Sequence, residues 1–324
     1  LARPVRSPRG AAESMIQIDF DAVHRLATVA SLVEPLRRAF LSPAVSPARA
    51  HHDLDAVDQP RSLLLMPSWQ PDGAIGVKIV TVFPGNAARG SASVNAVYLL
   101  LSGQTGQPRA WIDGRALTLF RTAAVSALAA DLLAPATPAV LLMVGTGALC
   151  RYLIEGHRAV RTYTSILVWG RDPQKAAAVA RDLSGRGWPV RAAADLHTAV
   201  RSADVISCAT LAEQPLIEGA WLKSACHLDL VGSFRSNMRE ADDDCLHGAF
   251  IAVDTLDALQ ASGDLISPLA AGVIVKEKIS SLTDLVAQTD KPTRASRTVF
   301  KSIGVAHADL AAAEQIYERH HRSA

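Results

Sequence analysis

VLLMVGTGALC, residues 140–150, is the stretch of sequence that decides the fold of this chain. Its first five residues are all apolar, which is typical of a central parallel strand with both faces covered. Two glycines then interrupt the run, and helical spacing follows from Ala148 to Val160. We therefore expect a strand, a tight turn and a helix in succession.

The turn Gly145-Thr146-Gly147-Ala148-Leu149 has the form G-x-G-x-x-C, with Cys150 where a third Gly or Ala usually stands. In this motif the first glycine permits the turn and the second lets backbone approach a pyrophosphate. The helix that follows offers free N–H groups to the anion. Because the motif lies between a strand and a helix, we predict that residues 145–149 bind a dinucleotide. The alternative is a tight turn that binds no ligand.

The next strand, expected at Ser165–Trp169, indicates which dinucleotide is bound. A ribose 2′-hydroxyl is normally held by an Asp or Glu about 20 residues after the turn, and the tip of this strand has none. Arg171 stands there instead, and a guanidinium suits a 2′-phosphate. We therefore predict NADP(H), with NAD(H) as the alternative because Asp172 follows directly. Arg171 could also be a solvated residue at a helix entry.

The spacing of apolar residues follows two different patterns along the chain. Short β-branched runs alternate with helical segments from about Ala139 to Ile274, which predicts parallel βαβ units. The strands expected there are Ala139–Val144, Ser165–Trp169, Val190–Ala192, Val205–Ala209, His227–Val231 and Phe250–Val253. From Met15 to Leu133 the pattern indicates an antiparallel sheet with a flanking helix at Asp21–Phe40. Its expected strands are Met15–Phe20, Ser62–Pro67, Ala74–Phe83, Ser93–Leu101 and Pro108–Asp113. Arg115–Leu133 is apolar on more than one side, as expected of a helix buried between two domains.

In the last fifty residues the apolar residues have helical spacing again, and a final helix is expected at Ala306–Arg319. At roughly 150 residues per domain, a chain of 324 residues is expected to form two domains. We therefore predict an α/β fold class, with a Rossmann doubly wound parallel sheet plus a mixed α+β domain.

Composition and charge exclude several classes of protein. Lys plus Arg total 33 and Asp plus Glu total 31, which gives a net charge of +2. The composition therefore lacks the excess of basic residues that is typical of nucleic-acid-binding proteins. No uninterrupted apolar run reaches 18 residues, so no membrane partner is expected. The four cysteines lack C-x-x-C or zinc-finger spacing, so we expect free thiols in a reducing cytoplasm and no metal site. We interpret residues 1–14 as a disordered tail ahead of a start at Met15.

The first half of the chain supplies cations rather than nucleophiles. It has no G-x-S-x-G, H-E-x-x-H or P-loop motif. Lys78 lies inside the apolar run Ile75–Thr81, where a buried lysine is costly unless it is paired or used. The alternative is a strand residue whose ammonium reaches water. Arg121, in an Arg-Thr-Ala-Ala segment that opens a helical run, and Arg49 are the other two candidate cations.

Four segments, in this order, resemble the ornithine cyclodeaminase/mu-crystallin family. They are Gly76–Val80 with Phe83–Asn86, Asp113-Gly114 with Leu119–Ala124, Val144–Gly147, and Phe300–Gly304. The resemblance extends from about Met15 to Arg319. It implies a homodimer built by the N-terminal half, with the last helix returning to that half. The domains it implies are a dimerisation and substrate domain at 15–133 plus 305–324 and a Rossmann domain at 134–304.

The resemblance also assigns roles to individual residues. Arg49, Lys78 and Arg121 match the residues that would bind a substrate carboxylate, and Thr122 would help to hold cofactor phosphate. A substrate would lie between the two halves, against the nicotinamide. We also place Ser233, in the turn after the strand at 227–231, among the cofactor contacts. Its alternative role is that of an ordinary turn residue.

One position departs from the family pattern. Where the cyclodeaminases and the related archaeal alanine dehydrogenases have an Asp for the substrate amine, this chain has Phe234. A phenyl ring accepts no proton and pairs with no ammonium group, so cyclodeamination is disfavoured. The segment looks more like the reductases of 1-pyrroline-2-carboxylate and 1-piperideine-2-carboxylate, whose cyclic substrates have no free amine.

We therefore expect NADPH-dependent reduction of a cyclic imino acid to L-proline or L-pipecolate. Arg49 and Arg121 would clamp the carboxylate and so orient the imine carbon for hydride transfer. Lys78 would be the catalytic proton donor, because burial and neighbouring arginines lower a lysine pKa towards neutrality. The alternatives are an ornithine cyclodeaminase that uses NAD and a non-catalytic ligand-binding protein like mu-crystallin.

Overall fold

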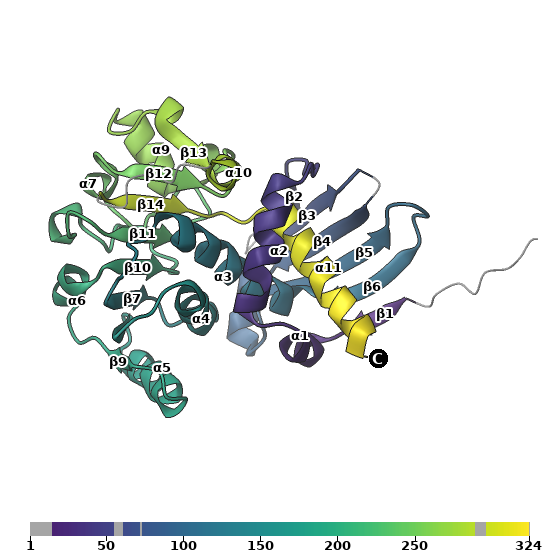
Figure 1. Cartoon of the computed structure of the whole chain (residues 1–324), viewed down its shortest axis with the longest axis horizontal. Helices are drawn as coiled ribbons and strands as arrows, with labels where there is room; N and C mark the ends of the chain where they lie inside the picture. Colours follow the sequence, from purple (N-terminus) through teal and green to yellow (C-terminus); the bar gives the residue numbers. More distant parts are fainter. Residues whose placement is uncertain (1–14, 55–60, 72, 289–295, 324) are drawn as a thin grey trace, which may run out of the picture.

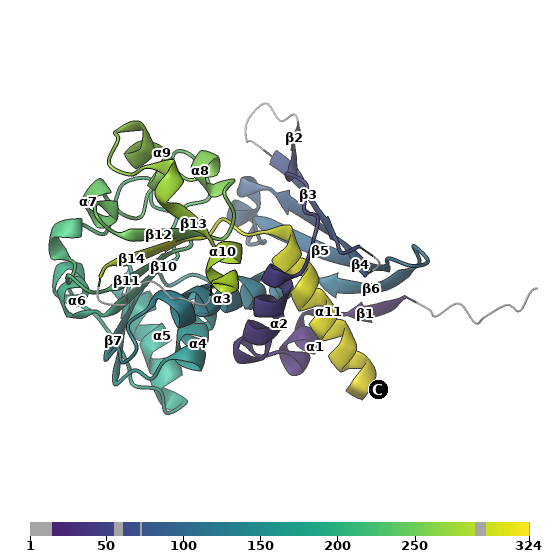
Figure 2. The same ribbon diagram turned by 45° about the horizontal axis from the view of Figure 1, so that its top comes forward.

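The structure, a computed structural model, describes residues 15–54, 61–71, 73–288 and 296–323. The tail expected at residues 1–14 lies outside this part of the chain. Two sheets lie side by side, each with its own helices, and a bundle of helices fills the space between them (Figures 1 and 2). This is the predicted fold class: a Rossmann-type parallel sheet joined to a mixed α+β domain.

The N-terminal sheet has six strands in the order β1-β6-β5-β4-β3-β2. They are β1 (Ile16–Ile18), β2 (Ala50–Leu54), β3 (Arg61–Trp69), β4 (Ala74–Val82), β5 (Val94–Ser102) and β6 (Pro108–Asp113). All neighbouring pairs are antiparallel except β1 with β6. The sequence pattern predicted five of these strands and missed β2, whose residues are too polar to form an apolar run. A 3-10 helix, Pro84–Arg89, connects β4 to β5.

Helices α1 (Phe20–Leu26) and α11 (Ala306–Ser323) pack against this sheet, and α2 (Val29–Leu41) packs against α11 and α3. The single helix expected at Asp21–Phe40 is therefore wrong: two helices form. The chain is extended at Ala27, and Thr28 starts the second helix through a capping box with Ser31. Helix α11 crosses the sheet although it comes last in the sequence (Figure 2).

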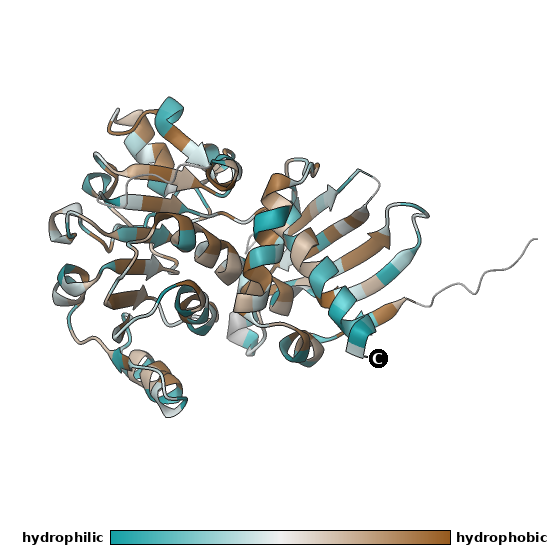
Figure 3. Ribbon diagram, viewed as in Figure 1, coloured by the Kyte–Doolittle hydropathy of each residue, from teal (hydrophilic) through white to brown (hydrophobic). Residues whose placement is uncertain are grey.

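The other face of this sheet is lined by apolar side chains. Cross-strand neighbours share a face, and the register pairs Pro67 with Val77, Val77 with Leu99, and Leu99 with Trp111. These side chains are only half-buried, whereas Tyr98 on the opposite face is fully buried. In Figure 3 the strands of this sheet carry brown segments among white and teal ones.

The second sheet has eight parallel strands in the order β13-β12-β14-β11-β10-β7-β8-β9. They are β7 (Val140–Val144), β8 (Ser165–Trp169), β9 (Val190–Ala192), β10 (Val205–Cys208), β11 (His227–Leu230), β12 (Phe250–Val253), β13 (Ile279–Ser281) and β14 (Thr298–Lys301). The six strands expected here all form. The expectation that the last fifty residues are wholly helical is wrong, because β14 lies between β12 and β11 near the middle of the sheet.

Helices and short turns connect the parallel strands. They are α4 (Cys150–Val160), α5 (Pro173–Gly185), α6 (Leu196–Ser202), η2 (Gly219–Trp221), α7 (Asp243–Leu246), α8 (Ala258–Ala261), α9 (Gly263–Ala270), η3 (Lys276–Lys278) and α10 (Leu282–Ala287). The chain runs from β7 outward to β9 and then returns to place β10 on the other side of β7. In open α/β sheets, ligands bind beyond the carboxyl ends of the strands at such a switch point.

Helix α3 (Gly114–Leu133) joins the two halves. It begins at Asp113, whose side chain accepts a hydrogen bond from N of Ala116, and it is buried along most of its length. It contacts α2 and α11 on one side and α4, β11 and β14 on the other. By length and composition it could cross a membrane, but 89% of its most apolar window is buried inside the protein, as in the core helix of a folded domain.

A buried polar network fastens α3 to the parallel sheet. Asp229 in β11 accepts hydrogen bonds from the hydroxyls of Ser126 in α3, at 3.0 Å, and Ser207 in β10, at 2.7 Å. His157 in α4 pairs with the same carboxylate at 3.1 Å. All four side chains are fully buried. Burial raises the pKa of Asp229, but the hydrogen bond and charge of His157 outweigh it and hold the pKa below its ordinary value.

Candidate functional site

The glycine turn has the geometry that an anionic diphosphate requires. Gly145 has φ of +115°, and a Cβ there would lie only 2.5 Å from the carbonyl oxygen of Ala209. A Cβ at Gly147 would meet nothing within 4 Å, so the backbone is open to a ligand at that point. Helix α4 has Leu149 as its N-cap and no side-chain cap, so no side chain occupies its first N–H groups, although that of Cys150 donates to the carbonyl oxygen of Gly147 at 3.1 Å.

The residues around this turn differ in what they can contribute. Thr146 and Ala148 lie in the turn itself, at the carboxyl edge of the sheet. Cys150 is buried, and burial raises the pKa of its thiol to about 12, so it serves as a small packing residue. Thr122 lies one residue after Arg121 in the buried middle of α3 and is 6% exposed.

The end of β8 presents Arg171 to solvent. Its neighbour Gly170 contacts the turn, because a Cβ there would lie 2.8 Å from Cγ2 of Thr146. Asp172 is the N-cap of α5, and its Oδ1 accepts from N of Gln174 at 2.9 Å and N of Lys175 at 3.3 Å. The carboxylate that follows Arg171 is therefore already used to start a helix.

Lys78 and Arg121 meet at a carboxylate that sequence reasoning missed. Nζ of Lys78 lies 2.7 Å from Oδ2 of Asp309, and Nε of Arg121 donates to Oδ1 of the same residue at 2.8 Å. Strand β4, helix α3 and helix α11 each supply one of these three side chains. All three are almost completely buried. Asp309 is recognisable afterwards as an acid at helical spacing with the apolar Ala313 and Ile316 of the same helix.

Arg49 completes a group of three cations. Its Nη2 donates to the carbonyl oxygens of Ile303 and Gly304, both at 3.3 Å. Gly304 has φ of +85°, and a Cβ there would lie 2.8 Å from Nη1 of Arg121. In the part of the chain that the structure describes, the two terminal nitrogens of Arg121 have no hydrogen-bond acceptor. A guanidinium fork therefore remains available next to Gly304.

Burial and the charge of Arg121 lower the pKa values of Lys78 and Arg49. Burial lowers the pKa of Lys78 to about 8, with a further lowering by Arg121 and an opposing effect of Asp309. Burial and Arg121 likewise lower the pKa of Arg49. The pKa of Asp309 is held below its ordinary value because the charges of Arg121 and Lys78 outweigh its burial. The cluster therefore contains one group, Lys78, that can exchange a proton near neutral pH.

A pocket of about 260 Å³ opens beside this cluster. Arg49, Met66, Gly304 and His307 line one side, and the loop after β12 lines the other. Burial lowers the pKa of His307 to about 4, so its ring is neutral at pH 7. Gly304 is the lining residue next to the guanidinium of Arg121, while Lys78 and Arg121 are not themselves part of the lining.

Asp254, at the end of β12, shapes the chain that crosses between the two sheets. Its carboxylate accepts from the hydroxyl of Ser302 and from N of Ile303 and Gly304, at 2.7 to 3.2 Å. Burial raises its pKa. Asp254 thereby fixes the two carbonyl groups that receive Arg49, and nothing in the sequence pattern marked it.

The turn after β11 differs from expectation at Ser233. Its side chain is fully buried, donates to the carbonyl oxygen of Met238 and pairs with the hydroxyl of Ser262 at 2.8 Å. The assignment of this side chain to the cofactor therefore does not agree with the structure. Phe234, in contrast, is 41% exposed, and the guanidinium of Arg235 lies 5.4 Å from its ring centre.

A sequence model of the ornithine cyclodeaminase/mu-crystallin family matches residues 14–324. The chain belongs to this family. Among its members, "Protein SAR DEFICIENT 4" of Arabidopsis thaliana is 39% identical over 289 residues, which are 86% of this chain and 88% of that protein. The Delta(1)-pyrroline-2-carboxylate reductase of Colwellia psychrerythraea is 33% identical over 311 residues, 93% of this chain and 98% of that protein.

A solved structure of a similar protein agrees over nearly the whole fold. It is the Delta(1)-pyrroline-2-carboxylate reductase of Thermococcus litoralis in complex with NADH and L-proline, with a TM-score of 0.89 and 28% identity. The match covers 95% of this chain and 98% of that chain. The resemblance predicted from the motifs is therefore confirmed at the level of the family and its fold.

Proposed function

We propose that this chain is a nicotinamide-dinucleotide-dependent oxidoreductase that reduces the C=N bond of a cyclic imino acid. The observation that carries the proposal is the free guanidinium fork of Arg121, which lies next to Gly304 of the pocket lining and shares Asp309 with a lysine of lowered pKa. A fork of this kind binds a carboxylate through two parallel hydrogen bonds. The reductases among the relatives act on a substrate of this class.

The three cations have distinct tasks in this proposal. Arg121 would bind both oxygens of the substrate carboxylate, and Arg49, which also lies at Gly304, would contribute the second positive charge. Asp309 holds Arg121 through Nε, so the terminal nitrogens keep one orientation. Fixing the carboxylate in this way orients the adjacent imine carbon and removes much of the entropic cost of the reaction.

Lys78 is the proton donor in this mechanism. A bound reduced dinucleotide supplies the hydride that forms the new C–H bond at the imine carbon. The imine nitrogen gains a proton from Nζ of Lys78 as the C=N π bond is broken, and solvent later returns a proton to the lysine. A group with a pKa of about 8 is charged at neutral pH and gives up its proton readily.

The residues of the glycine turn would hold the dinucleotide. Residues 145–149 and the first N–H groups of α4 would bind its diphosphate, and Thr122 would assist from α3. We propose NADPH in preference to NADH, because Arg171 is exposed at the tip of β8 while the carboxylate of Asp172 is used as an N-cap. NADH is the alternative, and the Thermococcus relative was solved with it.

We also propose that the protein is a homodimer that pairs through the uncovered face of the N-terminal sheet. The apolar residues Val77, Leu99 and Trp111 form a continuous row there and are only half-buried in one chain. An apolar patch of this kind marks an interaction surface. A cytoplasmic location fits the four cysteines, which are all unpaired and buried.

The activity test compares two reactions. The purified protein is mixed with NADPH and either 1-pyrroline-2-carboxylate or 1-piperideine-2-carboxylate, and the loss of NADPH absorbance is followed. In parallel, ammonia release is measured from ornithine with NAD. We expect reduction of at least one imine and no ammonia. Ammonia release without imine reduction would establish a cyclodeaminase instead, and dinucleotide binding with neither reaction would establish a ligand-binding protein.

Variants connect the activity to the site. Lys78→Met should keep dinucleotide affinity and lose most of kcat. The exposed Lys278→Met is the matched control and should behave as the wild type. Normal turnover by Lys78→Met would remove Lys78 from the mechanism.

A further inference from the structure

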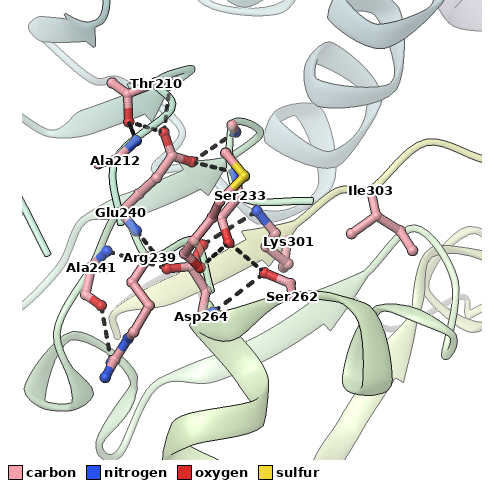
Figure 4. A network of polar contacts seen from close by, with 12 residues as sticks. Thr210, Ala212, Ser233, Arg239, Glu240, Ala241, Ser262, Asp264, Lys301 and Ile303 are labelled. Atoms are coloured by element: carbon pink, nitrogen blue, oxygen red, sulfur yellow. Dashed lines mark hydrogen bonds and ion pairs between the residues drawn. The ribbon is translucent and has the colours of Figure 1, made fainter. Parts of the chain in front are cut away.

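Glu240 is a fully buried carboxylate behind the loops at the cofactor edge. Its Oε1 accepts hydrogen bonds from N and Oγ1 of Thr210 at 2.7 and 2.8 Å. Its Oε2 accepts from N of Gly232 at 2.7 Å and N of Ser233 at 3.3 Å (Figure 4). One side chain therefore joins the loop after β10 to the loop after β11.

The loop after β10 lies between the loop after β11 and the glycine turn and contacts both. A Cβ at Gly232 would lie 2.1 Å from the carbonyl oxygen of Thr210, and one at Gly145 would lie 2.5 Å from that of Ala209. The loops after β7, β10 and β11 therefore pack backbone against backbone. They meet at the switch point of the sheet, where the dinucleotide is expected.

A second layer of buried groups holds Glu240 from behind. Oδ1 of Asp264 accepts from N of Glu240 at 2.7 Å and N of Ala241 at 3.3 Å, and Oδ2 lies 3.3 Å from Nζ of Lys301 (Figure 4). Both Asp264 and Lys301 are fully buried. A buried network whose members support one another is rigid, and its geometry is lost when one partner is changed.

We propose that Glu240 is a positioning residue for the dinucleotide, which holds the Thr210 and Gly232 loops against the glycine turn before any ligand arrives. A preformed crevice binds more tightly because no ordering cost is incurred on binding. The proposal rests on the dinucleotide dependence proposed above, but it does not depend on which imino acid is reduced. Glu240 has no reacting partner of its own and acts only through the two loops.

Glu240→Gln is the sharpest variant, because it keeps the shape of the side chain and replaces one acceptor oxygen with a donor. Whichever way the amide turns, its NH2 group faces a backbone N–H of Thr210 or Gly232, so at least one hydrogen bond becomes a clash of two donors. The two loops should separate. The matched control is Asp242→Asn, an acid nearby whose carboxylate accepts from N of Gly219 and Cys245 and, among the described residues, makes no hydrogen bond to Thr210, Gly232 or Ser233.

The experiment measures the Kd of NADPH and NADH by titration, together with the thermal midpoint of each variant. We expect Glu240→Gln to raise both dissociation constants by about tenfold or more, a loss of about 1.4 kcal/mol. Asp242→Asn should change the two dissociation constants by no more than about twofold, which is a minor change in binding free energy. This should hold even if its thermal midpoint falls as far as that of Glu240→Gln. A merely structural role would change the midpoint of both variants and the affinity of neither.

Two outcomes would overturn the inference. A folded Glu240→Gln that binds both dinucleotides as the wild type does removes the positioning role while leaving the proposed function intact. If the wild type binds neither dinucleotide, both the positioning role and the proposed function are excluded. If Glu240→Gln does not fold, Thr210→Val deletes the hydroxyl hydrogen bond to Glu240, together with the weaker one that the hydroxyl accepts from N of Ala212 at 3.3 Å. Weaker dinucleotide binding by that variant supports the inference, and unchanged binding refutes it.

Discussion

Replacing Asp309 with Asn should move the pH dependence of catalysis. Asp309 is the carboxylate that lies 2.7 Å from Nζ of Lys78 and 2.8 Å from Nε of Arg121. Asn has the same shape but carries no charge. The variant therefore keeps the packing of α11 against β4 and removes the group that raises the pKa of Lys78.

The size of the effect follows from the geometry. At an effective dielectric constant of about 20, unit charges 2.7 Å apart interact by about 6 kcal/mol, which is an upper bound. Nearby opposite charges in proteins commonly change a pKa by about 1–3 units. The pKa of Lys78, about 8 with Asp309 in place, should therefore fall to about 5–7. At pH 7.5 the protonated fraction would drop from about three quarters to about one quarter or less.

The assay is the pH profile of kcat/KM for imine reduction. Its alkaline limb, where the proton donor loses its proton, should lie near pH 8 in the wild type and about 1–3 units lower in Asp309→Asn. Asp309→Glu keeps the charge and should keep the limb near its original position. Glu314→Gln, which neutralises another acid of α11, is the matched control.

An alkaline limb that stays in place in Asp309→Asn would refute the reasoning. Breaking a buried ion pair costs about 3–5 kcal/mol of folding free energy, so urea unfolding must first show that the variant is folded under the assay conditions.

Three further predictions concern the cofactor, the sheet face and the buried network. Arg171→Ala should weaken NADPH binding by about tenfold or more and change NADH binding little, and Arg181→Ala is the control. Equal losses of affinity for both dinucleotides would contradict the 2′-phosphate assignment. Val77→Asp should convert a dimer to monomers in size-exclusion chromatography, and an unchanged elution volume would exclude this face. Asp229→Ala should lower the free energy of unfolding in urea by about 3–5 kcal/mol, because His157 and two hydroxyls lose their partner. The pKa of Asp229 is depressed, so its contribution is present above about pH 4 and is lost at lower pH; a deficit independent of pH would contradict this account.

Sequence patterns predicted the elements whose structure is decided locally. The apolar run at 140–144 followed by two glycines is enough to predict the strand and the turn. A strand buried on both faces requires consecutive apolar residues, and the positive φ of the turn favours glycine, so both signals lie in adjacent residues. The strands at Val190–Ala192 and Phe250–Val253 were predicted to the residue. The break at Thr28 was missed because the apolar spacing continues across it, while the capping box that starts α2 depends on local hydrogen bonds.

Lys78 could be selected from the sequence because a charge inside an apolar segment is costly wherever that segment folds. Arg121 was selected from its place beside Thr122, and the family resemblance supported both residues. Their partner could not be selected in this way. Asp309 lies 188 residues after Arg121, and only the packing of α11 against β4 and α3 brings it into contact. The same holds for Glu240, which joins two loops of the parallel sheet.

The sequence by itself therefore determined the strand–turn–helix that begins the parallel sheet, the family, and the cations of the pocket. Only the tertiary structure decided that Asp309 holds those cations, that Ser233 is turned inward, and that β14 lies in the middle of a sheet. The physical reason is that periodicity and turn chemistry act over a few residues. The pairing of buried charges depends on which elements meet in space, and no local pattern records that.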